Sequence, residues 1–245
     1  MKRYMIALVS MVGMVVVASA GDAVDYSVNG ELFEGYMEKG EENAPMVLLI
    51  HDWDGLTDYE VKRAGMLKEM GYSVFAIDLY GKGVRPTELE DKKKCMTMLT
   101  SDRPKMREYM KGALDFAQGQ GLNTDNCVAM GYCFGGTAVL ELARSGAPLK
   151  GFATFHGGLA CPDDQDYSNS TGEFIIMHGT ADSMIGMDQF AALANDLEKA
   201  GIPHKMITYG GAPHGWTVFG SGAYREKQDK QSWNHFSDFL EDVLK

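Results

Sequence analysis

Short apolar runs and amphipathic segments alternate along most of this chain. Continuous apolar runs of strand length occur at 46–51, 72–79, 127–130, 149–155, 173–178 and 205–209. Apolar residues recur at helical spacing at 58–70, 87–100, 103–118, 134–145, 187–200 and 224–243. Strands that alternate with helices favour parallel pairing through right-handed crossovers. The pattern therefore predicts an α/β fold, a mostly parallel sheet with helices on both faces.

The segment before the first long apolar run has a different pattern. Residues 24–36 read as a β-hairpin around Asn29-Gly30, a dipeptide that accepts the positive φ angles of a tight turn. No repeat, low-complexity tract or Pro/Ser-rich linker follows, so residues 21–245 are expected to form one domain. In such a sheet, functional residues lie in loops just beyond the carboxyl ends of the strands.

The first twenty residues are typical of a signal peptide. Lys2 and Arg3 precede an apolar run at 5–17, and Ala18-Ser19-Ala20 supplies a small-residue cleavage site. The run is about a dozen residues, shorter than the roughly twenty that a membrane span needs. We expect cleavage after Ala20, export to the periplasm or the medium, and no membrane anchor in the mature chain.

The charge balance argues against anionic partners. The chain carries a net charge of −11, and −13 without Lys2 and Arg3. Such a surface repels phosphate backbones, which disfavours nucleic-acid binding. The chain has no Gly-rich phosphate loop, no dinucleotide fingerprint and no metal-binding histidine spacing, so no cofactor or metal is expected.

The strongest chemical signal is Gly131-Tyr132-Cys133-Phe134-Gly135-Gly136, between a predicted strand and a predicted helix. It has the form of a nucleophile elbow with cysteine in place of the more usual serine. The turn is so tight that side chains at 131 and 135 would collide with their neighbours. Cys133 is therefore the candidate nucleophile, with a buried structural cysteine as the alternative.

A thiol nucleophile needs a base, and the base needs a carboxylate that fixes its tautomer. In this kind of fold the chain order is nucleophile, acid, histidine. Asp182 follows the strand at 173–178 and His214 follows the strand at 205–209, in that order. The other histidines fit less well, because they close core strands, break the order, or lie at a strand start or within a helix: His51, His156, His178, His204 and His235.

The negative oxygen that forms on acyl transfer needs hydrogen-bond donors. One is expected from the backbone N–H of Phe134, at the positive end of the following helix. The second is expected from the N–H of Trp53, in the loop after the first long strand. Three further cysteines, Cys95, Cys127 and Cys161, could form at most one disulfide among them or remain buried thiols.

With these motifs together, the chain resembles the dienelactone hydrolases, the cysteine-nucleophile branch of the α/β-hydrolase fold. The resemblance covers nearly all of the mature region and rests on five segments in order: His51-Asp52-Trp53-Asp54-Gly55-Leu56, Asp78-Leu79-Tyr80-Gly81, Gly131-Tyr132-Cys133-Phe134-Gly135-Gly136, His178-Gly179-Thr180-Ala181-Asp182 and His214-Gly215-Trp216. It implies a Cys133, Asp182 and His214 triad with the amides of Trp53 and Phe134 as oxyanion hole. It also implies that Asp52, where well-known members have glutamate, touches the resting thiol.

Two departures from the family pattern concern the substrate. The resemblance implies two arginines that hold a substrate carboxylate, and the corresponding positions are Lys82 and Val218. Lysine keeps the charge but loses the bidentate fork, and valine supplies nothing polar. Lys82 is thus either a substrate contact or a solvated loop charge, and a neutral ester or lactone is the expected substrate. The alternatives to a hydrolase are a non-catalytic small-molecule-binding protein on the same fold and a thiol acyltransferase.

Overall fold

One eight-stranded sheet organises the chain, and a computed structural model describes it over residues 21–245. The leader peptide expected at 1–20 lies outside the described residues. The strands lie side by side in the order β1 (Asp22–Val28), β2 (Glu31–Glu38), β4 (Ser73–Ile77), β3 (Pro45–Ile50), β5 (Asn123–Tyr132), β6 (Gly151–Phe155), β7 (Glu173–Gly179) and β8 (His204–Tyr209). The pairs β1–β2 and β2–β4 are antiparallel, and the others are parallel. The predicted mostly parallel sheet with an N-terminal hairpin is confirmed.

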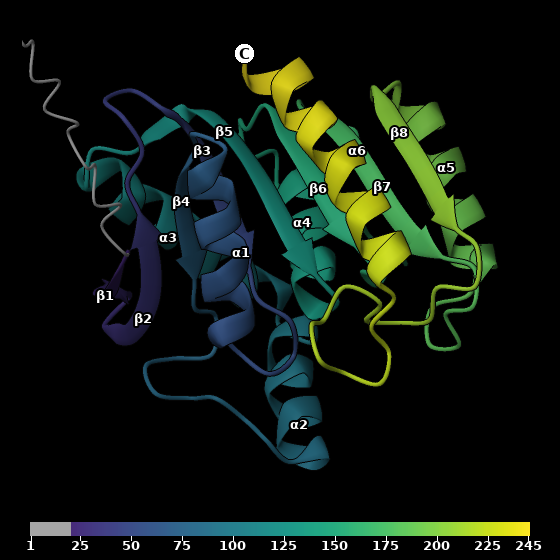
Figure 1. The fold of residues 1–245 in the computed structure, drawn as a ribbon, viewed down its shortest axis with the longest axis horizontal. Coiled ribbons are helices and arrows are strands. Elements are labelled where there is room, and N and C mark those ends of the chain that lie inside the picture. Colours follow the sequence, from purple (N-terminus) through teal and green to yellow (C-terminus); the bar gives the residue numbers. More distant parts are fainter. Residues whose placement is uncertain (1–20) are drawn as a thin grey trace, which may run out of the picture.

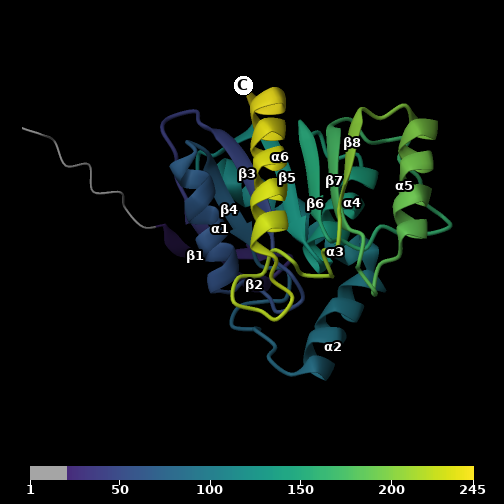
Figure 2. The same ribbon diagram turned by 45° about the vertical axis from the view of Figure 1, so that its right-hand side comes forward.

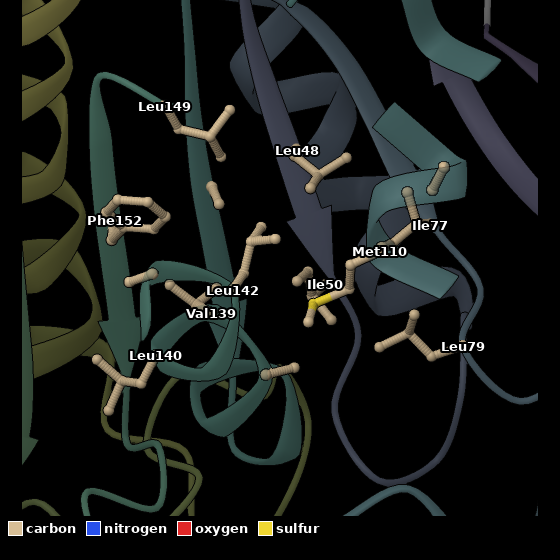
Figure 3. Packing of buried hydrophobic residues seen from close by; sticks show 14 of the residues in the cluster. Leu48, Ile50, Ile77, Leu79, Met110, Val139, Leu140, Leu142, Leu149 and Phe152 are labelled. Carbon is tan, nitrogen blue, oxygen red and sulfur yellow. The ribbon is translucent and has the colours of Figure 1, made fainter. Parts of the chain in front are cut away.

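Helices cover both faces of the sheet (Figure 1). They are α1 (Asp58–Glu69), α2 (Leu89–Thr100), α3 (Arg103–Gly119), α4 (Phe134–Arg144), α5 (Met187–Ala200) and α6 (Glu226–Leu244). Buried residues of α3, α4 and α5 share one apolar cluster, and those of α1 and α6 share the other. In the first cluster, Leu48 and Ile50 of β3 lie between Met110 of α3 and Val139 of α4 (Figure 3). No helix within residues 21–245 is long and apolar enough to cross a bilayer.

Helix α2 stands apart from these layers. It lies beyond the end of the sheet at which the parallel strands terminate, in both views (Figures 1 and 2). Leu99 is its one buried residue. The helix therefore lies at the edge where the strand-end loops are expected to carry the functional residues.

The element boundaries follow the hydrophobic pattern with one clear exception. The structure starts β5 at Asn123, whereas the apolar run predicts a start at Cys127. The four extra residues are polar and largely half-exposed, and Asn123 pairs with Pro45 across an irregularity in the β3–β5 register. Strand pairing extends here beyond the buried run, so hydrophobicity does not mark it.

Candidate active site

Cys133 lies in a strained turn between β5 and α4. Its backbone has φ 51° and ψ −113°, in the positive-φ region that non-glycine residues rarely adopt. The turn is fixed on both sides, because the Cys133 N–H donates to the carbonyl of Phe155 at 3.0 Å and its carbonyl accepts the N–H of Thr137 at 3.2 Å. This geometry is that of the predicted nucleophile elbow, and the thiol is half-buried.

The glycines beside Cys133 permit contacts that no side chain would allow. A Cβ on Gly131 would lie 2.3 Å from the carbonyl oxygen of Gly135. A Cβ on Gly135 would lie 2.2 Å from the carbonyl oxygen of Ile50, at the end of β3. The collisions expected at these two positions are therefore real, and Gly135 lets the elbow pack directly against the loop that starts at His51.

His214 and Asp182 reach Cys133 from the ends of β8 and β7. The loops that carry them meet closely at Gly179, where the lack of a side chain makes room. A Cβ at this position would lie 2.2 Å from the carbonyl oxygen of Ala212. The Nε2 of His214 lies 3.1 Å from the Cys133 Sγ, and its Nδ1 lies 2.8 Å from the Asp182 Oδ2. The structure thus brings the three predicted residues into one hydrogen-bonded chain, with the acid buried behind the imidazole.

The electrostatics of this chain favour a charged imidazole. The Asp182 Oδ1 accepts the N–H groups of Met184 and Ile185, each at 2.9 Å. Burial opposes ionisation of Asp182, but the hydrogen bonds from His214 and these amides lower its pKa. Burial also disfavours the His214 cation, yet the hydrogen bonds to Asp182 and Cys133 raise its pKa to about 10. An imidazolium is therefore stable beside the thiol at neutral pH.

The two backbone N–H groups that the sequence predicts for an oxyanion have no acceptor among the described residues. Phe134 is the first residue of α4, where amides have no partner within the helix. Neither its N–H nor that of Trp53 donates to an acceptor within residues 21–245. These are the two donors that the sequence predicts for an oxyanion.

No hydrogen bond joins Asp52 to the Cys133 thiol within residues 21–245, and the contact that the resemblance implies stays a prediction. The thiol bonds to His214, whereas the Asp52 Oδ1 accepts the N–H of Asp54 at 2.8 Å. Aspartate is one methylene shorter than glutamate, and its carboxylate turns back on its own loop. Burial raises the pKa of Asp52 to about 6. Behind it, burial and then the Asp52 charge raise the pKa of Glu60 to about 8.

Lys82 faces the N-terminal hairpin. Its Nζ lies 2.5 Å from the Asp25 Oδ2 and 4.0 Å from a Glu34 oxygen, and its side chain is 40% exposed. These carboxylates already balance its charge. A substrate contact at Lys82 stays a prediction that the observed ion pairs do not favour.

The remaining histidines have varied surroundings. His51 is buried, with Nδ1 2.6 Å from the Asp52 carbonyl and Nε2 accepting the Leu79 N–H. His178 is buried and stacks on Phe190. His204 and His235 lie 2.7 Å from the Ile202 carbonyl and 2.9 Å from the Tyr209 hydroxyl, respectively.

Three residues near the site are missed by the sequence reasoning. Glu60 carries a signal that could have found it, since Thr57-x-x-Glu60 forms a capping box at the start of α1. Tyr80 has a buried hydroxyl without a hydrogen-bond partner among the described residues, and its ring stacks on Phe134. His156, rejected as a base on chain order, packs its ring 5.1 Å from that of His214. No sequence spacing marks His156, whereas Tyr80 lies in the segment Asp78-Leu79-Tyr80-Gly81, to which no role was assigned.

The cysteine, histidine and acidic side chains of residues 21–245 form neither a disulfide nor a metal-binding cluster. Cys95, Cys127, Cys133 and Cys161 are all free thiols in the described structure. Within the same range, no group of three or more histidine, cysteine, aspartate or glutamate side chains could hold a metal ion.

Comparison with known proteins gives consistent matches. The model of the dienelactone hydrolase family matches residues 33–244. Protein usf of Aquifex pyrophilus is 24% identical over 230 residues, covering 91% of this chain and 99% of its own. A Bradyrhizobium sp. protein named "Probable 2-oxo-3-(5-oxofuran-2-ylidene)propanoate lactonase" is 24% identical over 233 residues, covering 90% of this chain and 94% of its own. The solved structure named m3DLH has a TM-score of 0.84 at 28% identity, covering 92% of this chain and 98% of its own. The predicted α/β-hydrolase fold is confirmed.

Proposed function

The chain belongs to the dienelactone hydrolase family and is a hydrolase of carboxylic esters or lactones, and we propose that it cleaves them by acyl transfer through the thiolate of Cys133. One observation carries the proposal. A nucleophile-type turn presents a thiol 3.1 Å from an imidazole that a buried carboxylate holds at 2.8 Å. This arrangement supports covalent catalysis because each group supplies what the next one lacks.

The first half of the reaction forms a thioester. The thiol proton already resides on the His214 Nε2, the thiolate sulfur bonds to the substrate carbonyl carbon, and the carbonyl π electrons move to oxygen. The amides of Trp53 and Phe134 donate to that oxyanion. As the tetrahedral intermediate collapses, the bond to the alkoxide breaks and the alkoxide takes the proton from His214. Asp182 stabilises the imidazolium throughout.

The second half restores the enzyme. His214 takes a proton from water, the hydroxide attacks the thioester, and the same amides hold the second oxyanion. The C–S bond then breaks, and the Cys133 thiolate leaves with its electron pair. The carboxylic acid is released, and the thiolate and imidazolium are paired again.

The substrate is an uncharged ester or lactone in this proposal. Lys82 is engaged by Asp25 and Glu34, and Val218 supplies no charge, so neither position offers a free cation to a substrate carboxylate. Matched aryl esters with and without a distal carboxylate test this. We expect kcat/KM to be higher for the neutral ester. A preference for the carboxylate would contradict the proposal.

Burst kinetics with an activated aryl ester test the nucleophile. The protein is compared with Cys133→Ala, Cys133→Ser and a matched control, Cys161→Ala, whose thiol is half-buried elsewhere. We expect a burst in the wild type and the control and loss of turnover in both Cys133 variants. Turnover by a folded Cys133→Ala protein would refute the thiolate mechanism.

The same ester reactions distinguish a hydrolase from the two alternative functions, a non-catalytic binding protein and a thiol acyltransferase. Wild-type protein that binds ester without turnover is a binding protein, and product that contains an added alcohol in place of water identifies an acyltransferase.

We also propose that the protein is exported after removal of residues 1–20, because Lys2 and Arg3 precede the apolar run at 5–17. N-terminal sequencing of the exported chain should begin at Gly21, and Met1 at the mature terminus would contradict export.

A further inference from the structure

A second histidine is buried directly beside the triad. His156 directly follows β6, is fully buried, and has a positive φ of 42°. Its ring centroid lies 5.1 Å from that of His214, with the two planes at 63°. Trp216 closes a further side at 5.0 Å. Neither step of the mechanism uses His156, so its strained backbone and burial have no explanation in the triad alone.

Hydrogen bonds fix the His156 ring from behind. Its Nε2 lies 2.8 Å from the Thr217 Oγ1, and the Tyr59 hydroxyl donates to that same oxygen at 2.8 Å. The Arg63 Nε in turn donates to the Tyr59 oxygen at 3.4 Å. Because Thr217 accepts from Tyr59, its own proton is available for His156. In this arrangement Nε2 accepts and the His156 proton resides on Nδ1, which is buried without a hydrogen-bond partner among the described residues.

A buried ion pair anchors the far end of this chain. An Arg63 guanidinium nitrogen lies 2.5 Å from the Asp229 Oδ1 and also donates to the Thr217 carbonyl at 2.9 Å. Both side chains are buried, at 1% and 6% exposure. Helix α1 thereby holds Thr217, only three residues after His214, on both its side chain and its backbone, and α6 fixes Arg63 through Asp229.

The charges around His214 make a neutral neighbour important. The groups whose charges act with it are Cys133, Asp182, Asp52, His178 and His156. Burial, followed by the positive charge of His214, holds the pKa of His156 well below its usual range. A neutral imidazole can therefore pack against the His214 cation without repelling it.

We propose that His156 is a positioning residue, a neutral imidazole fixed through Thr217, Tyr59 and Arg63 that holds the His214 ring where its two nitrogens reach Cys133 and Asp182. The inference rests on the proposed function, since it assigns His214 as the base. The alternative is that His156 only fills space in the core.

Variants at two positions separate these roles. His156→Gln keeps a hydrogen-bonding group near the Nε2 position and loses the ring, whereas His156→Phe keeps a ring and loses the hydrogen bond. Thr217→Val removes the hydroxyl, and Thr217→Ser is its matched control. We expect both His156 variants and Thr217→Val to lower kcat on the order of tenfold with KM within about twofold, because small displacements of a catalytic group are costly. Thr217→Ser should restore the wild-type kcat.

A double variant that combines His156→Phe with Thr217→Val gives a sharper test. Since the hydroxyl acts through His156, Thr217→Val should lower kcat little further when His156→Phe is already present. Multiplicative loss of kcat would overturn the proposal. So would variants with a lowered Tm, a wild-type kcat per active site counted from the burst amplitude, and an unchanged His214 pKa.

NMR titration of His214 is independent of turnover. The pKa of His214 should fall toward 6.5 in His156→Gln and in Thr217→Val, because a displaced ring makes weaker hydrogen bonds to Asp182 and Cys133. An unchanged His214 pKa in these variants would refute positioning. A lowered pKa with unchanged kcat would support positioning and instead contradict the proposed role of His214 as base.

Discussion

Replacing Asp182 by asparagine tests the carboxylate behind the imidazole. The two carboxylate oxygens have different partners, since Oδ1 accepts the N–H groups of Met184 and Ile185 and Oδ2 lies 2.8 Å from the His214 Nδ1. An amide offers one oxygen and one NH₂ group. If its oxygen keeps the two backbone donors, the NH₂ donates to Nδ1 and moves the imidazole proton to Nε2. That nitrogen then presents a proton to Cys133 and can no longer accept one.

The expected loss can be bounded from the structure. Asp182 and Cys133 together raise the pKa of His214 from 6.5 to about 10, which corresponds to roughly 5 kcal/mol at about 1.36 kcal/mol per unit. A barrier increase of roughly 4–5.5 kcal/mol lowers a rate by about 10³–10⁴-fold. The same substitution in a serine triad costs about 10⁴-fold in kcat. We therefore expect kcat for Asp182→Asn to fall about 10³–10⁴-fold.

Initial rates of ester hydrolysis across pH measure this effect, with circular dichroism to check the fold. Asp164→Asn is the control, because Asp164 is an exposed loop carboxylate and its variant should keep wild-type rates. A folded Asp182→Asn protein within tenfold of the wild-type kcat at neutral pH would refute the reasoning.

Four further predictions concern packing, a buried charge, and the pH dependence of activity and of stability. Gly135→Ala places a Cβ 2.2 Å from the Ile50 carbonyl oxygen and should cost about 1–3 kcal/mol by urea denaturation, so an unchanged midpoint would count against the close packing of the elbow. Arg63→Met leaves Asp229 buried without its cation and should cost about 3–5 kcal/mol in the same assay, whereas a cost below about 1 kcal/mol would mean that the pair is not needed. For alkyl esters, kcat/KM should stay level through neutral pH and decline as the pH approaches about 10, because His214 then loses the proton that the leaving alkoxide needs. A decline of kcat/KM centred near pH 7 would contradict the raised pKa of His214. The raised pKa of His214 also gives a contribution to stability that is complete below pH 6.5 and lost as the pH rises toward about 10, which denaturation of His214→Phe and wild type across pH would measure.

Much of the fold is predictable because burial on both faces leaves a direct mark on the sequence. Strands such as β3 read as unbroken apolar runs, and α5 ends as predicted because Gly201 adopts a left-handed φ of 67°. The polar start of β5 at Asn123 was missed, since its partner Pro45 supplies backbone pairing and no apolar surface is buried there. Pairing that does not bury apolar side chains has no periodicity to detect.

In the candidate site, too, some residues could be predicted from the sequence and others could not. Cys133, Asp182 and His214 were predictable because parallel strands bring their carboxyl ends to one edge, whatever their separation along the chain. The orientation of Asp52 was not, because it depends on one methylene of side-chain length and on the N–H of Asp54. His156 was missed because its surroundings are assembled from helices α1 and α6 and the loop after His214, and no local spacing records such contacts.

Rapid quenching followed by mass spectrometry tests the central claim most directly. During turnover of a slowly deacylated aryl ester, we expect the intact protein to gain the mass of one acyl group and peptide mapping to locate it on Cys133. The adduct should disappear when substrate is exhausted and should be absent from Cys133→Ala. Turnover without any adduct on Cys133, or an adduct on another residue that accounts for the turnover, would contradict a thioester intermediate.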